Sequence, residues 1–564
     1  MNPFARRVVC GLLMVLIAAT AAAAQPRRTR PQRIDPLTSS IEGRVTTADT
    51  GAPIRGAEVR LSIDGRFSRL ATTDAEGRYE MRHLPAGDYR LIVSKAGFIT
   101  LEYGQRRPFE SASTIPLGEG QRATANIVLI RGGAIVGRIT DPFGEPSVGT
   151  RVQVLRNRAE DGARRLVPVG VADQTDDTGA FRIYGLPPGD YFVTASTGLV
   201  DAVKRDPPVY YPGTLTFAEA QPITLAAGGE ASADFQIVES ARGATVSGVV
   251  LTSTGSPAAR AMIGLWPNSY SARQNAPGSA MLRGDAGPDG TFSIQNVPPG
   301  SYTLTAMGAI SEFSAGAAAA LDTTRIGGPP RALPQPPETG SMPLTVTSDG
   351  VSGITLTTRP GGRITGRFVP DTGVTQPVPR SLQVTMQFST PGQMITSANN
   401  GDQFQMNGVG GPARIVVNGV PDGWAVKSIL LDGEDVADRG FDLSGKDANV
   451  RIVMTDRVAT LSGIVQSDRS RRDHNVIVFA EDAARWTGSS RFVRVVRADR
   501  DGRFRVQGLL SERYLVAALE YLEDGEEQDR QLLERLRNRA TSVSLGEGEQ
   551  RSIQLDLVAR EGRV

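Results

Sequence analysis

A short phrase recurs along this chain and constrains its fold more than any other feature. It reads D-x-x-G-x-(Y/F) and is followed, a few residues later, by an apolar residue, a Pro/Gly turn and a Tyr. The copies lie roughly 100 residues apart: TTDAEGRYEMRHLPAGDYRLIV, QTDDTGAFRIYGLPPGDYFVTA, GPDGTFSIQNVPPGSYTLTA, the degraded NNGDQFQMNGVGGPARIVV, and DRDGRFRVQGLLSERYLVAA. A repeat of this period indicates an array of one structural unit, because a chain of 564 residues is too long for a single core.

The chemistry of the phrase predicts a hairpin turn. Asp74 can bond the local backbone and Gly77 can adopt a positive φ. Tyr79 and Met81 then alternate with charged residues, which is the period of a half-buried antiparallel strand. Each copy is preceded by a short strand with a central Gly, as in IEGRV and TLSGIV, and this Gly suggests a bulge or a close backbone approach.

These patterns predict an all-β protein, a tandem array of about five Greek-key, prealbumin-like β-sandwich domains with one short helix in the last. We call these units modules. The predicted boundaries are 1–24 for a signal peptide, 25–39 for a linker, and 40–131, 132–241, 242–361, 362–457 (divergent) and 458–564 for the five modules. A flexible insertion is expected at about 308–342 and a helical one at about 523–540.

The repeat resembles a known family. The succession G-x-V, G-x-P-x-x-G-A-x-V, T-D-x-x-G-x-Y and L-P-x-G-x-Y is similar to the carboxypeptidase regulatory-like domain, with Cna B-type and carbohydrate-binding-like sandwiches as relatives. The match is strongest in the first module, where GAPIRGAEVRL precedes the turn. The resemblance covers nearly the whole chain after residue 24 and implies the fold; it says little about function.

The N-terminus predicts export. Arg6 and Arg7 precede a short apolar run, and Ala22–Ala24 offers a cleavage site before Gln25. Cleavage would remove Cys10, the single cysteine, which leaves no thiol or disulfide chemistry, and no later segment reads as a membrane span. We therefore expect a periplasmic, cell-surface or extracellular protein. The formal net charge of +2, with arginines scattered among acids, argues against a nucleic-acid partner.

Irregular segments fall at one place in four modules, after the Tyr strand of the repeat. The insertion of the first module begins at Lys95, and that of the fifth module places Leu532, Leu533 and Leu536 on one face of a helix. Such insertions either form binding surfaces or cap the open end of each sandwich. In the fourth module, PDGWAVKSILLDGEDVADRGFDL is expected to form extra strands instead.

Catalytic and metal chemistry finds little support. The two histidines, His83 and His474, lie in different modules and lack zinc-site or triad spacing. His83 is expected at the surface beside a turn. The acid-rich turns at Asp176 and Asp499 lack the Glu of a calcium loop and are interpreted as turns. We predict no catalytic residue, cofactor or metal site, and place an unrecognised hydrolase last among the alternatives.

The four lysines, at positions 95, 204, 427 and 446, avoid the opening strands, so we predict none of the Lys–Asn/Asp crosslinks that Cna B-type relatives can carry. Sugar binding stays open, because exposed aromatic rings can stack on sugars. The candidates for carbohydrate contact are Trp266, Trp424, Trp486, Tyr210 and Tyr211, each of which could equally fill a core or a joint.

The sequence therefore favours an exported, non-catalytic structural or interaction protein. Its partner would be an envelope or extracellular protein or a glycan. The alternative is a carbohydrate-binding protein that uses aromatic residues at the loop ends. Whether the modules form a rigid rod or a flexible string, and in which oligomeric state, does not follow from the residues.

Overall fold

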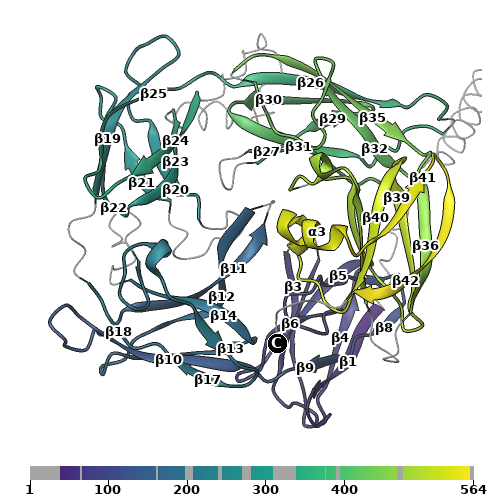
Figure 1. The fold of residues 1–564 in the computed structure, drawn as a ribbon, viewed down its shortest axis with the longest axis horizontal. Helices are drawn as coiled ribbons and strands as arrows, with labels where there is room; N and C mark the ends of the chain where they lie inside the picture. Colours follow the sequence, from purple (N-terminus) through teal and green to yellow (C-terminus); the bar gives the residue numbers. More distant parts are fainter. Residues whose placement is uncertain are drawn as a thin grey trace, which may run out of the picture.

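The regular secondary structure of the described residues is almost wholly β-strand, as the computed structural model shows (Figure 1). The structure describes residues 39–63, 66–160, 163–196, 208–238, 244–269, 281–308, 338–374, 376–388, 394–443, 445–466, 474–488 and 490–558. The expected signal peptide, the linker and most of the 308–342 insertion lie outside these residues. The predicted all-β class of sandwich sheets is confirmed, whereas the division into five modules stays a prediction.

One strand plan recurs in each predicted module. The opening strand pairs antiparallel with the strand that follows the D-x-x-G turn and parallel with the closing strand, as β1 (Ser39–Thr47) does with β4 (Arg78–Leu84) and with β8 (Arg122–Thr124) and β9 (Ile127–Leu129). A second sheet holds the tyrosine strand of the repeat. The main clusters of buried apolar side chains fall one in each predicted module.

The first two modules share the same pairs of sheets. In the first, the sheet β4–β1–β8 faces β3–β2–β5–β6, and the remaining bounds are β2 (Glu58–Ile63), β3 (Arg66–Thr72), β5 (Gly87–Ser94), β6 (Leu101–Glu102) and β7 (Ile115–Leu117). In the second, β13–β10–β17 faces β12–β11–β14–β15, with bounds β10 (Gly133–Thr140), β11 (Arg151–Glu160), β12 (Ala163–Gln174), β13 (Ala180–Leu186), β14 (Gly189–Ser196), β15 (Val209–Tyr210), η1 (Phe217–Glu219), β16 (Ile223–Leu225), β17 (Glu230–Ser232) and β18 (Phe235–Gln236).

The third and fourth modules vary this plan. The third has sheets β22–β19–β25 and β21–β20–β23–β24, with bounds β19 (Ala244–Leu251), β20 (Met262–Pro267), β21 (Leu282–Asp285), β22 (Thr291–Val297), β23 (Gly300–Met307), β24 (Thr339–Val346) and β25 (Val351–Thr357). The fourth has β29–β30–β26–β35–β32–β33 and β28–β27–β31–β34, with bounds β26 (Gly362–Pro370), β27 (Gln383–Phe388), β28 (Met394–Thr396), β29 (Ala398–Asn400), β30 (Gln403–Val409), β31 (Pro412–Asn418), β32 (Ala425–Leu431), β33 (Glu434–Asp435), β34 (Phe441–Asp442) and β35 (Ala448–Thr455). The extra strands expected after PDGW are therefore β32, β33 and β34.

In the fifth module the two sheets join into one, because β40 also pairs with the closing strand β42. The bounds are β36 (Ala459–Gln466), β37 (Asn475–Ala480), η2 (Ala483–Arg485), β38 (Val493–Arg497), β39 (Arg503–Leu509), β40 (Glu512–Leu519), η3 (Glu526–Gln528), α3 (Arg530–Arg537), β41 (Thr541–Leu545) and β42 (Gln550–Val558). Helix α3 confirms the predicted helix in shorter form, with Leu532, Leu533 and Leu536 buried. No helix among the described residues is long and apolar enough to cross a membrane.

The turn that recurs in the repeat is held by hydrogen bonds from backbone amides to its Asp side chain. Asp176 Oδ1 accepts hydrogen bonds from the amides of Thr178 and Ala180, both at 2.9 Å, and Gly179 has a φ of 78°. Because local amides occupy these carboxylates, the turn interpretation of the acid-rich phrases is confirmed. The tyrosine of the phrase is buried, and its hydroxyl donates to the carbonyl four residues earlier, as Tyr89 does to Pro85 at 2.8 Å.

The central Gly of the opening strand marks a close backbone approach in four modules, and in the fourth module Gly366 instead lies against the Phe404 ring. A Cβ added at Gly463 would lie 2.2 Å from the carbonyl oxygen of Ile553 on the closing strand and 2.7 Å from the Phe504 ring. The corresponding distance at Gly43 to the Ala125 oxygen is 2.0 Å. The opening strand can therefore lie between its two neighbours only where it has no side chain.

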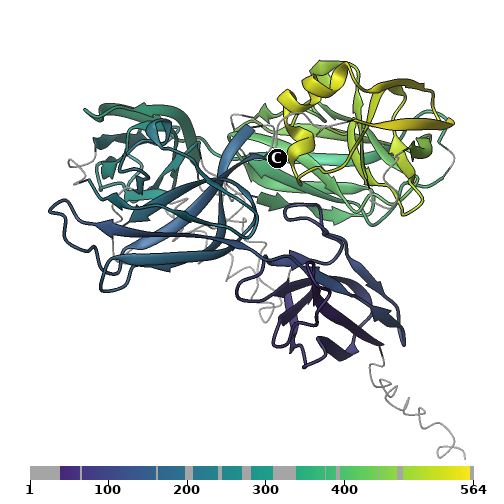
Figure 2. The same cartoon turned by 60° about the horizontal axis from the view of Figure 1, so that its bottom comes forward.

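The modules follow one another around a closed ring (Figures 1 and 2). The first joins the second through the amide of Gly132, which donates to the Gly97 carbonyl at 3.1 Å. The second contacts the third where the amide of Leu166 donates to the Ser269 carbonyl at 2.8 Å. Residues of the third and fourth modules line a shared cavity of about 270 Å³. The chain is therefore neither an extended rod nor a string.

The ring closes where residues 520–529 of the fifth module, here called the closure segment, meet the second module. Arg156 and Glu523 form an ion pair at 2.7 Å, and their side chains are only 9% and 10% exposed. The ring of Phe109 lies under two guanidinium groups, 4.4 Å from that of Arg156 and 4.9 Å from that of Arg158. Removing one partner of such a buried ion pair would leave the other charge out of water and uncompensated. The joint therefore depends on both residues.

The closure segment also binds the insertion of the first module. The Tyr521 hydroxyl donates to the Pro108 carbonyl at 2.6 Å, and the Ser111 hydroxyl donates to Asp524 Oδ1 at 2.9 Å. Further polar contacts of this joint are Arg107–Glu520, Arg164–Asp529, Arg497–Glu110 and Arg497–Gly104. Two of the predicted insertions are thus used within the chain, against each other.

We predict that Gly463→Ala will lower the free energy of unfolding by about 3 kcal/mol, because the new methyl group collides with backbone that cannot move. Gly546→Ala is the matched control, since its Cβ would meet only the Glu549 carboxylate, at 3.4 Å. Chemical unfolding of the three proteins measures the difference. Equal stability of the two variants would contradict the role given to the opening-strand glycine.

Candidate functional site

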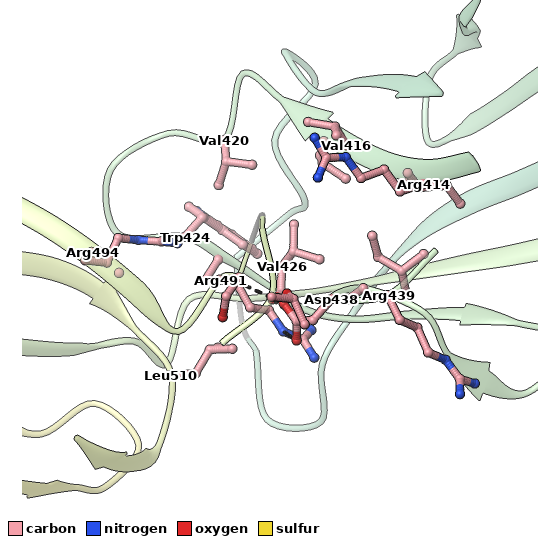
Figure 3. Close-up of a pocket in the computed structure, with 18 of the residues that line it drawn as sticks. Arg414, Val416, Val420, Trp424, Val426, Asp438, Arg439, Arg491, Arg494 and Leu510 are labelled. Carbon is pink, nitrogen blue, oxygen red and sulfur yellow. Dashed lines mark hydrogen bonds and ion pairs between the residues drawn. The ribbon is translucent and has the colours of Figure 1, made fainter. Parts of the chain in front are cut away.

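The larger candidate site is a cavity of about 730 Å³ between the fourth and fifth modules, which we call the Trp424 cleft (Figure 3). Its fourth-module wall comes from β27, β31, the turn before β32, and residues 437–440. Its fifth-module wall is lined by Thr487, Gly488, Ser490, Arg491, Arg494, Gln507, Gly508 and Leu510. A cavity of this size lies within the range of small-molecule and cofactor sites.

The turn Pro421–Trp424 places the indole on the wall. The amide of Trp424 donates to the Pro421 carbonyl at 3.1 Å, and Gly423 has a φ of 84°, which only glycine adopts without strain. Trp424 is half-buried and packs against the fourth-module core. One face of the indole is therefore supported by the core while the residue still lines the cleft.

Arg491 ties the two walls together. Its Nε and backbone amide reach the two carboxylate oxygens of Asp438, at 3.0 and 3.1 Å, and its Nη2 lies 2.8 Å from Asp435 Oδ2. It also donates to the Lys427 carbonyl. The guanidinium is 12% exposed and its donors are engaged by the fourth module, so it positions the joint.

The electrostatics of the joint depend on Asp435. Burial raises the pKa of this carboxyl group, but the hydrogen bonds from Arg491 and from the backbone amides of Ala437 and Ile429 outweigh burial, so the pKa lies below its usual value. Beside the cleft, Lys427 binds Asp371 at 2.7 Å and Glu547 at 3.2 Å. The hydrogen bond that Lys427 Nζ donates to Asp371 is the main reason that the pKa of Lys427 is raised.

Four arginines and two aspartates line the cleft: Arg414, Arg439, Arg491, Arg494, Asp422 and Asp438. Arg414 donates to Gln387 Oε1 at 2.9 Å across the β27–β31 pair, and Arg439 pairs with Glu434. Arg494, on β38, makes one hydrogen bond, from Nη1 to the Val493 carbonyl at 3.0 Å. The cleft combines an indole with an excess of cationic side chains. These arginines were not among the sequence candidates, because the cleft exists only where two modules meet.

Two of the sequence candidates for sugar contact are buried. Trp486 is 6% exposed, donates from Nε1 to the Ala480 carbonyl at 2.7 Å, and packs edge-on against Phe479. Tyr210 is 5% exposed and lies near Phe217. As placed, neither ring has a face on which a sugar could stack, because the fold uses both to fill apolar space.

The remaining candidates are half-buried. Tyr211 packs edge-on against Phe235 of the second-module core. Trp266 lines the 270 Å³ cavity and donates from Nε1 to Thr305 Oγ1 at 3.2 Å. The five candidates are thus dispersed over the ring, and Trp424 is the one that lines the larger cavity.

The residues considered for other chemistry are also dispersed. His83 is exposed, as predicted, and His474 is buried at 3% exposure in a different module. Within the described ranges, no group of three or more His, Cys, Asp or Glu side chains could hold a metal ion. Lys95 donates to the Gly56 carbonyl at 3.1 Å, and Lys204 lies outside the described residues. The absence of Lys–Asn/Asp crosslinks stays a prediction.

We predict that the joint weakens in acid. Because the pKa of Asp435 is lower in the folded protein than in the unfolded chain, its contribution is complete above about pH 4 and is lost as the pH falls below that value. Asp435→Asn should therefore destabilise the protein at pH 7 by about 1 kcal/mol, a value reduced for its partly exposed carboxylate, and by less at pH 3.

Chemical unfolding of wild type and Asp435→Asn at both pH values tests this, with Glu434→Gln on the same strand as the control. A difference between wild type and Asp435→Asn that does not change with pH would contradict the assignment.

Comparison with known proteins agrees with the family that the repeat resembles. The model of the carboxypeptidase regulatory-like domain matches residues 40–130. A comparison with curated proteins found no match. Among solved structures, the chain overlaps a minor pilin of Streptococcus agalactiae (17% identity, 35% of this chain and 94% of that one, TM-score 0.20). It also overlaps a streptococcal ancillary pilin (14%, 57% and 99%, TM-score 0.19).

A third similar structure is a putative carbohydrate-binding protein of Bacteroides uniformis, with 10% identity over 31% of this chain and 98% of that one, and a TM-score of 0.14. Overlaps this low support no inference about function. The family match is different, because it falls on the module whose residues carry the fullest copy of the repeat. The resemblance of this chain to the carboxypeptidase regulatory-like domain is therefore shown for residues 40–130.

Proposed function

We propose that this protein is an exported, non-catalytic interaction protein that binds a glycan in the Trp424 cleft. The observation that carries the proposal is the position of Trp424 on the wall of a cavity of about 730 Å³. An aromatic face held by a core and flanked by planar polar groups is the kind of surface on which sugar rings stack. The sandwich modules would act as the scaffold that holds the two walls of the cleft together.

Several features of the cleft support binding rather than catalysis. Its lining residues include Asp422 and Asp438, and Arg491 engages both carboxylate oxygens of Asp438. Arg491 itself is engaged by three groups of the fourth module. The Asp438 carboxylate is therefore engaged by contacts within the protein. The polar groups are suited to orienting a bound molecule.

Substitution of Trp424 tests the proposal. Trp424→Ala should weaken binding to the glycans selected by the wild-type protein on a glycan array at least tenfold, because stacking on the indole is lost. Trp266→Ala is the matched control, since Trp266 is also half-buried but lines the other cavity. Isothermal titration with the selected glycan measures both variants.

Failure of the wild-type protein to bind any glycan would overturn the proposal. Loss of binding in Trp266→Ala with retention in Trp424→Ala would move the site to the smaller cavity.

A further inference from the structure

Arg494 differs from Arg491 and Arg439, two other arginines of the Trp424 cleft, in how its charge is compensated. Arg491 is held by two aspartates, and Arg439 by Glu434. Arg494 takes part in none of the ion pairs formed by the described residues, and its one hydrogen bond goes to the carbonyl of the preceding residue, Val493. A guanidinium offers five donors in a planar fork, so most of the capacity of Arg494 is unused.

The surroundings of Arg494 make this lack of a partner costly. Burial lowers the pKa of its guanidinium, and the attraction of Tyr514 and Asp438 compensates only in part. Asp438 also binds Arg491 through both of its oxygens. A partly desolvated cation without a carboxylate partner is unusual, because charges removed from water are normally paired.

The position of Arg494 places this cation at the cleft. Arg494 and Trp424 both line the cavity, and Figure 3 shows them on the same side of it, with Arg494 projecting from the fifth-module strand. A ligand that stacks on the indole would therefore lie within the field of the guanidinium. Gln507, which also lines the cleft, adds a neutral polar group to the same wall.

We propose that the ligand of the Trp424 cleft is an acidic glycan, whose carboxylate is bound by Arg494. This inference rests on the proposed function and adds the charge of the ligand to it. A carboxylate can accept two parallel hydrogen bonds from the planar guanidinium group of arginine, and this bidentate geometry adds selectivity to the attraction between the charges. Uronic-acid residues supply such a group next to a sugar ring that can stack on the indole.

A matched pair of oligosaccharides tests the charge. Isothermal titration of the full chain with a tetragalacturonate and with its methyl ester compares two ligands of the same ring structure that differ in charge. The wild-type protein should bind the acid at least tenfold more tightly than the ester, and this preference should shrink as the salt concentration rises.

Arg494→Gln should abolish the preference by weakening the acid and leaving the ester unchanged, and Arg494→Lys should keep part of it. Arg513→Gln is the control, because Arg513 pairs with Glu481 within the fifth module, lies outside the lining of the cleft, and should leave the preference intact. Arg494→Lys also serves if Arg494→Gln fails to fold.

The outcomes separate this inference from the function on which it rests. If the acid and the ester bind equally and binding depends on Trp424, the proposal that the ligand is acidic is wrong, whereas the proposed glycan binding stands. A preference for the acid that is undiminished in both Arg494 variants would overturn the role of Arg494. Absence of binding to the acid in the wild-type protein would overturn the acidic ligand itself.

Discussion

The ion pair between Arg156 and Glu523 is the contact on which the shape of the molecule most depends. The two residues are 367 positions apart in the chain and are almost wholly removed from solvent. Phe109 of the first module lies against the Arg156 guanidinium, so three modules meet at one point. The other joints described above link predicted modules that are neighbours in sequence, so this joint turns a linear array into a ring. A linear array would leave its ends free, whereas the ring fixes the fifth module from two sides.

Closure of the ring helps to fix the shape of the Trp424 cleft, because the fifth module supplies one wall of the cleft. Arg491 and Lys427 hold that module against the fourth, and the closure segment holds it against the first and second. Two walls fixed in this way form a binding site with little rearrangement, which lowers the entropic cost of binding. The structure therefore has three levels: glycine-dependent sandwiches, charged joints between them, and a cleft at one joint.

Local structure followed from the sequence, whereas the joints did not. The turn at Asp176, the close approach at Gly463 and the buried face of the helix at Leu532 each depend on residues within a short segment, so pattern and propensity predict them. The carboxypeptidase regulatory-like resemblance held for residues 40–130. The ring and the cleft depend on pairs such as Arg156–Glu523, which no periodicity reveals. For the same reason Trp486 was a candidate by residue type alone, although it fills the space against Phe479.

The ring is tested most directly by a crosslink across its closure. Ser111 and Asp524 lie in hydrogen-bond contact at 2.9 Å, so cysteines at these positions should be close enough for a disulfide. In a chain with Cys10→Ser, the pair Ser111→Cys and Asp524→Cys should form an intramolecular disulfide under mild oxidation, seen as a mobility shift on non-reducing gels. The pair Ser111→Cys and Val171→Cys, the latter at a position 84% exposed, is the control and should not. Rapid, near-complete crosslinking of the first pair alone is the predicted result. Failure of that pair to crosslink in the folded protein would show that the array is open.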